Sequence, residues 1–137
     1  MSVPQPSWLL AVDPVNKSLI GTALKGHDAV AYFKEGRPAK GKGEFRHDWS
    51  SAKWYFTSAE NRDEFARNPE KYAPQFGGYC VWAVSCGYTA SIDSEAWKII
   101  DGKLYLNYSR EVQKMWEADV PGHIRLGNEN WPRLIKR

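Results

Sequence analysis

Two runs of alternating β-forming residues, 96–100 and 103–108, are the clearest pattern along the chain. They are joined by Asp101-Gly102, a dipeptide that favours the tight type I′ turn of a β-hairpin. We therefore predict two antiparallel strands in this part of the chain.

Two further β-rich segments, 44–47 and 53–56, flank a turn at residues 50–51 and predict a second hairpin. Ahead of them, the apolar run 29–33 follows Asp28. A run this short fits either a buried strand or a short helical turn.

Helix signals stand between and after these hairpins. Ser58 is predicted to cap a helix over 59–67, because its hydroxyl can accept from the free amides of the first turn. The apolar stretch 79–86 ends at Gly87, a residue suited to a left-handed C-cap. This ending favours a short buried helix over a strand.

Ser109 is predicted to cap another helix, and a last helix is expected over 124–135. Helical spacing predicts one apolar face on the helix after Ser109, made of Val112, Met115, Trp116 and Val120. The resulting fold class is α+β: a single compact domain with a small antiparallel sheet of hairpins, packed by short helices and C-terminal helices.

The 137 residues, 42% hydrophobic and 26% charged, are typical of one soluble domain. Prolines predict an irregular leader over 1–22, followed by the domain over 23–137. Residues 1–10 lack the basic and apolar regions of a signal peptide. We expect a periplasmic or secreted location if a leader was removed, and a cytoplasmic one otherwise. No apolar run approaches the roughly 20 residues of a membrane span.

The net charge of +3 comes from interspersed basic and acidic residues, which excludes a continuous stripe for nucleic acid. The aromatic residues recur at core spacing, which also argues against stacking on single strands. Gly41-Lys42-Gly43 lacks the spacing and hydroxyl of a phosphate loop.

Cys80 and Cys86 are the most chemically distinctive residues. On one helix they would be separated by about 9 Å of rise and would point to different sides, so neither a disulfide nor a shared metal is within reach. The alternatives are two buried cysteines that act as small apolar side chains, or one cysteine that acts alone. A lone thiolate binds Cu(I) or Zn(II) if imidazoles join it, and the chain offers His27, His47 and His123.

Four motifs in order resemble the YHS domain family, in its branch of small stand-alone bacterial proteins. They read Gly26-His27-Asp28-Ala29-Val30-Ala31-Tyr32-Phe33, Trp54-Tyr55-Phe56-Thr57-Ser58-Ala59-Glu60-Asn61-Arg62, Asn68-Pro69-Glu70-Lys71-Tyr72-Ala73-Pro74 and Gly77-Gly78-Tyr79-Cys80. The resemblance covers residues 23–132 and implies a small α+β domain that binds heavy metals, copper in particular. Metal-associated members carry cysteines in the first two motifs, whereas here the remaining motif thiol is Cys80.

The leading hypothesis is therefore a non-enzymatic metal-binding or metal-handling domain for copper or zinc. Cys80 is its predicted soft ligand, with His47 and His27 as nitrogen ligands. One alternative is a metal-free module that binds a protein partner or small ligand in an aromatic groove around Tyr32, Trp54 and Trp82. Another is a thiol-dependent enzyme that uses Cys80.

Overall fold

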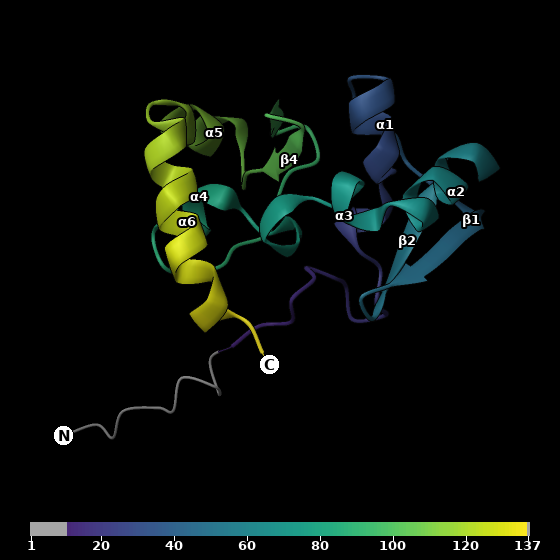
Figure 1. The fold of residues 1–137 in the computed structure, drawn as a ribbon, viewed down its shortest axis with the longest axis horizontal. Coiled ribbons are helices and arrows are strands. Elements are labelled where there is room, and N and C mark those ends of the chain that lie inside the picture. The colour runs from purple at the N-terminus through teal and green to yellow at the C-terminus, as the bar shows by residue number, and fades with distance from the viewer. Residues whose placement is uncertain (1–10, 137) are drawn as a thin grey trace.

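Two antiparallel hairpins, each a sheet of its own, organise an α+β fold (Figure 1). The structure is a computed structural model that describes residues 11–136. Strand β1 (Lys42–Trp49) pairs with β2 (Ala52–Phe56), and β3 (Trp97–Ile100) pairs with β4 (Lys103–Leu106). Both predicted hairpins are confirmed.

The two hairpin turns use the left-handed backbone region, as tight primed turns require. Asp101 and Gly102 have φ values of 51° and 75°. Ser50 and Ser51 have φ values of 53° and 58°, in a turn without glycine. The turn at Asp101-Gly102 was therefore predictable from its own residues, whereas the turn at Ser50-Ser51 was predictable only from the β-rich segments on either side of it.

The first half of the chain adds the 3₁₀ turn η2 (Leu24–Gly26) and helices α1 (Ala29–Lys34), α2 (Ala59–Arg67) and α3 (Pro69–Tyr72). The run 29–33, which fitted a strand or a helical turn, is the helix α1. The predicted cap of α2 is confirmed, because the Ser58 hydroxyl accepts a hydrogen bond from the amide of Asn61 at 3.1 Å.

The second half contains η3 (Gln75–Gly78) and helices α4 (Val81–Ser85), α5 (Arg110–Glu117) and α6 (Val120–Leu134). The helix predicted over 79–86 is present as α4 but is shorter, because Cys80 and Cys86 lie at its two ends. Gly87 follows it with a left-handed φ of 94°, as expected of a C-cap.

The last helix begins earlier than the predicted residue 124. Asp119 caps α6 by accepting from the amide of Gly122 at 3.1 Å. Pro121 lies in the first turn, where its missing N–H removes no helical hydrogen bond. The Pro-Gly pair therefore starts the helix instead of interrupting it, and Val120 belongs to α6.

The predicted apolar face of α5 is partly wrong. Trp116 is fully buried, but Met115 is 49% exposed. Ser109 caps the helix as predicted, by accepting from Val112 at 3.1 Å. Helical spacing placed Met115 beside Trp116, and the packing of α5 leaves Met115 on the solvent side.

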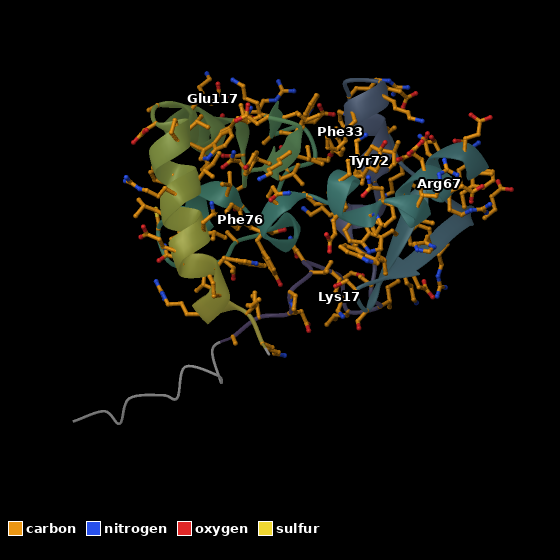
Figure 2. The ribbon with its side chains drawn as sticks, viewed as in Figure 1. Lys17, Phe33, Arg67, Tyr72, Phe76 and Glu117 are labelled. Carbon is orange, nitrogen blue, oxygen red and sulfur yellow. The ribbon has the colours of Figure 1, made fainter. Side chains whose placement is uncertain are left out.

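Two apolar clusters fill the interior. One includes Trp54, Phe56 and Phe65 between the β1–β2 hairpin and helices α1 and α2, and extends to Cys80 and to Leu106 of β4. The other lies beneath α6 and includes Phe76 and Trp116. Figure 1 shows α4, α5 and α6 together at one end of the molecule and α1, α2 and the β1–β2 hairpin at the other. Phe33 and Tyr72 meet edge to face at 5.3 Å between α1 and α3 (Figure 2).

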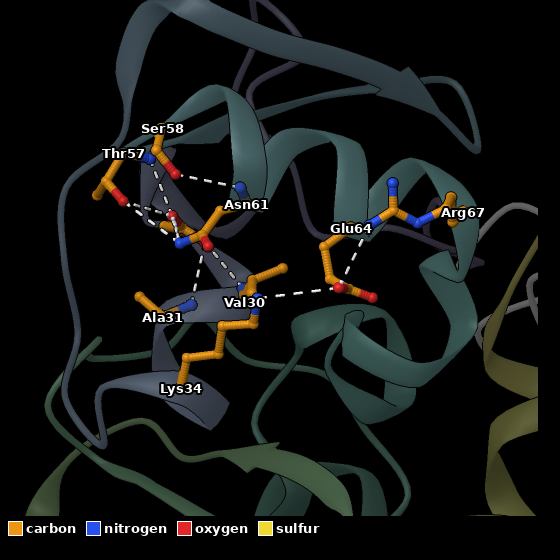
Figure 3. A network of polar contacts seen from close by, with 9 residues as sticks. Val30, Ala31, Lys34, Thr57, Ser58, Asn61, Glu64 and Arg67 are labelled. Atoms are coloured by element: carbon orange, nitrogen blue, oxygen red, sulfur yellow. Dashed lines mark hydrogen bonds and ion pairs between the residues drawn. The ribbon is translucent and has the colours of Figure 1, made fainter.

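A buried carboxylate joins α1 to α2. Asp28 is fully buried, and its Oδ1 accepts from the amides of Val30 and Ala31 at 2.8 and 3.1 Å. Its Oδ2 accepts from the amide and hydroxyl of Thr57 at 2.8 and 3.0 Å and from Asn61 Nδ2 at 2.9 Å. This network, called the Asp28 network below, caps α1 and attaches it to the start of α2 (Figure 3).

The two ends of the described chain pair with each other. The amide of Val12 donates to Leu134 at 2.9 Å, and the amide of Lys136 donates to Val12 at 2.8 Å. Val15 is buried in the first cluster. Of the expected leader over 1–22, residues 11–22 form no helix or strand and join the fold through isolated bridges and the buried Val15, and residues 1–10 lie outside the described chain. Between residues 11 and 136, no helix is long and apolar enough to cross a membrane.

Candidate functional site

A pocket of about 230 Å³ opens beside Cys80. It lies between the start of α4, the loop that follows α4, and the junction from β4 to α5. Its walls are mainly apolar and aromatic, and are formed by Cys80, Trp82, Ala83, Tyr88, Ala90, Tyr108 and Val112. Tyr88 and Tyr108 are 52% and 59% exposed, whereas Cys80 is 1% exposed. The tyrosines therefore form the rim of the pocket, and Cys80 lies at its floor.

Backbone pairing fixes the position of Cys80. Its amide donates to the carbonyl of Ala90 at 3.0 Å, and the residue forms a parallel bridge to Leu106 of β4. Cys80 therefore precedes α4 while it lies against the edge of the second hairpin. This pairing explains why the residue is buried although it stands at a helix end.

The sulfur of Cys80 has two polar contacts. It accepts from the amide of Tyr108 at 3.2 Å and donates to Asn107 Oδ1 at 3.6 Å. Burial raises the pKa of the Cys80 thiol, and nearby backbone amides of Ala83, Tyr108 and Trp82 oppose this rise. The net upward shift favours the protonated thiol, which is the form that donates to Asn107.

Asn107 supports the floor of the pocket. It is fully buried, and its Oδ1 also accepts from the amide of Trp82 at 3.3 Å. Its Nδ2 has no protein partner in the described chain. A buried amide without a partner is costly, so a buried water at this donor would be stabilised.

Cys86 lies apart from the pocket. It is exposed and follows the end of α4, and both cysteines are free thiols. The prediction that they do not pair is confirmed. Next to Cys86, the Ser85 hydroxyl donates to the carbonyl of Trp82 at 2.6 Å and lies 3.1 Å from His123 Nδ1. His123, on α6, also packs its ring against Trp82 at 4.8 Å.

His27 and His47, the two predicted nitrogen ligands, have other contacts. His27 follows η2, and its Nδ1 lies 3.3 Å from the carbonyl of Leu24. Desolvation lowers the pKa of His27. His47 lies in β1 opposite Trp54 and packs its ring edge-on against Phe65 at 6.1 Å.

The structure therefore places Cys80 at the start of α4 beside β4, His27 directly after η2, and His47 on β1. Within residues 11–136, no three side chains of the His, Cys, Asp and Glu types gather into a group that could hold a metal ion. Of the three histidines, His123 is the one that contacts α4.

The aromatic groove predicted around Tyr32, Trp54 and Trp82 is wrong in two of its three members. Tyr32 and Trp54 are 1% and 2% exposed and belong to the core. Trp82 does line the pocket. The rim residues Tyr88 and Tyr108 were missed, and the one signal in the sequence was that they adjoin the C-cap Gly87 and the N-cap Ser109.

Comparison of the chain with family models, with curated proteins and with solved structures found no match. The resemblance to the YHS family thus rests on the four sequence motifs. The geometry of the pocket beside Cys80 is the remaining basis for a functional proposal.

Proposed function

We propose that this protein is a non-enzymatic binding module whose pocket beside Cys80 takes a small, mainly apolar molecule. The observation that carries the proposal is the pocket itself, with an aromatic rim of Tyr88 and Tyr108 above a buried floor. Binding sites for small molecules are typically concave, mainly apolar, and equipped with a few placed polar groups.

The size of the pocket limits the ligand. Its volume is about 230 Å³. An apolar cavity of about 150 Å³ takes benzene, and sites for drug-sized ligands span about 300–1,000 Å³. A single aromatic ring, or a bicyclic ring such as indole, is therefore the class of ligand that fits. Tyrosine and tryptophan rings favour such a ligand through edge-to-face or offset contacts.

The floor of the pocket favours binding over thiol chemistry. A nucleophilic cysteine reacts as the thiolate, and burial raises the pKa of Cys80. The sulfur is also engaged with Tyr108 and Asn107. The thiol therefore acts as a polarisable, protonated wall of the pocket, and Asn107 holds it from behind that wall.

The test is a titration of ¹⁵N-labelled protein with indole and with phenol, followed by amide chemical shifts. Saturable shifts confined to Ala83, Tyr88, Ala90 and Tyr108 are expected. Ala90→Leu fills the pocket and should weaken binding at least about tenfold. Ala118→Leu adds the same side chain at an exposed position and should leave binding unchanged. The absence of shifts, or equal binding by both variants, contradicts the proposal.

Copper or zinc binding is the second candidate, because a soft ion can reach the pocket that Cys80 lines. It would use Cys80 with His47 and His27, or with other donors that move on binding. An anaerobic competition titration with Cu(I) and Zn(II) separates the two proposals. Cys80→Ser should abolish tight metal binding if the second candidate holds, and should change indole binding by no more than a few-fold if the first holds.

A further inference from the structure

A turn at the molecular surface presents two adjacent aliphatic side chains. Leu19 is 108% exposed and Ile20 is 73% exposed. They occupy the centre of the turn 18–21, which is called the apolar tip below. Of the large hydrophobic residues that are exposed in the described chain, Leu19 and Ile20 are the two that are adjacent in sequence. The centre of a surface turn usually holds polar residues or glycine, so this pair requires an explanation.

The apolar tip has a defined conformation. The amide of Gly21 donates to the carbonyl of Ser18 at 2.9 Å, which closes the turn. The amide of Ser18 donates to Thr22 at 2.9 Å, and the Ser18 hydroxyl accepts from the amide of Thr22 at 3.1 Å. These bonds satisfy the backbone groups at the base, so the two aliphatic side chains project from a tied turn.

Two lysines border the apolar tip. Lys17 directly precedes the turn, and its Nζ donates to the carbonyl of Ser51 at 2.8 Å; Figure 2 shows it at the edge of the molecule. Lys53, on β2, bonds to Gly21 through its backbone amide at 2.8 Å and extends its side chain toward that glycine. The neighbouring Asp48 is held by Arg46 at 2.7 Å, and this ion pair has no net charge.

We propose that the apolar tip docks this protein on the surface of an anionic lipid bilayer. Leu19 and Ile20 would enter the boundary between headgroups and acyl chains, while Lys17 and Lys53 meet the anionic headgroups. This proposal concerns where the protein resides in the cell, and it does not depend on what binds in the pocket beside Cys80.

Three features favour a bilayer over a protein partner. The tip offers two exposed aliphatic side chains on one turn, whereas protein interfaces cover about 800 Å² on each partner. The flanking cations are lysines, which are depleted from protein interfaces, and the tip lacks the Trp, Tyr and Arg anchors that dominate binding hot spots. By contrast, each lysine near an anionic membrane strengthens the electrostatic attraction of the protein to the lipid headgroups. The long lysine side chain can also lie along apolar groups while its ammonium stays in water.

The test is flotation of the full chain with vesicles of phosphatidylcholine alone and of phosphatidylcholine mixed with phosphatidylserine. The protein should float with the mixed vesicles, and less so as salt rises from about 0.1 M to about 1 M, where the screening length falls from about 10 Å to about 3 Å. The double variant Leu19→Ser with Ile20→Ser should lose at least about tenfold in vesicle affinity. Lys17→Gln with Lys53→Gln should reduce the affinity and its dependence on salt.

Leu126→Ser is the matched control, because it removes a 39% exposed aliphatic side chain from α6. It should float as the wild type does. Leu19, Ile20 and Leu126 are exposed, whereas Lys17 and Lys53 are half-buried, so urea unfolding of each variant should accompany the flotation and show that it folds. Failure of the wild type to float with the mixed vesicles overturns the proposal, and so does equal flotation of the Leu19 and Ile20 double variant. Concentration-dependent self-association that the double variant abolishes would assign the tip to a second copy of the chain instead.

Discussion

Replacement of Asp28 by asparagine tests whether the Asp28 network holds the first half of the fold together. The change preserves size and removes one acceptor oxygen from a fully buried site. Five donors from four residues surround the carboxylate, at 2.8 to 3.1 Å. An asparagine amide has one oxygen, so it can serve only one side of this set.

The loss of stability can be worked out for the orientation of the asparagine amide that leaves fewer donors without an acceptor. If its oxygen faces Thr57 and Asn61, its NH₂ group faces the amides of Val30 and Ala31, and two buried backbone donors lose their acceptor. Each buried donor without a partner costs about 1–3 kcal/mol. We therefore expect Asp28→Asn to lower the free energy of unfolding by about 2–6 kcal/mol, a large part of the about 5–15 kcal/mol typical of a domain.

Urea unfolding followed by tryptophan fluorescence measures this loss. Asp119→Asn is the matched control, since Asp119 caps α6 through a single exposed bond to the amide of Gly122. A change of about 1 kcal/mol or less is expected for the control. If the two variants lose equal stability, the buried network is not the main restraint on α1 and α2, and the reasoning is refuted.

Three further predictions concern single sites. Gly77→Ala should lower the free energy of unfolding in urea by at least about 2 kcal/mol more than Gly36→Ala does. Both glycines have positive φ, but a Cβ at Gly77 would collide with the carbonyl oxygen of Pro14. Equal losses in the two variants would contradict this prediction. Desolvation lowers the pKa of His27 below its ordinary value of 6.5. The unfolded state then binds more protons, so stability should fall as the pH drops through 6.5, and His27→Gln should lessen that fall; identical pH profiles would rule it out. Iodoacetamide should modify the exposed Cys86 before the buried Cys80 at pH 8, as peptide mass mapping would show, and the reverse order would refute the assigned burial.

Features that depend only on residues close in sequence were predictable. The Asp101-Gly102 turn and the caps at Ser58 and Ser109 are local, because each is set by a few consecutive residues. The orientation of α5 is not local, because the burial of Trp116 with exposure of Met115 depends on how α5 packs on the second apolar cluster.

The candidate site was less predictable for the same reason. Cys80 stood out by its chemistry, but its pocket needs Tyr88 and Tyr108, which meet only when the loop after α4 lies beside the end of β4. No periodicity encodes that meeting. His47 was selected as a ligand for its residue type alone. Side chains alternate between the two faces of β1, and the face of His47 is the one that packs against Phe65.

The pairing of Val12 with residues 134–136 has a consequence for synthesis on the ribosome. The chain emerges from its N-terminus, so the partners of Val12 are made last. The first apolar cluster can assemble during translation, but the second needs α6 and stays open until that helix is complete. Nascent chains that stop before residue 120 should therefore expose Phe76 and Trp116 to chaperones, and the emergence of α6 should cover both side chains.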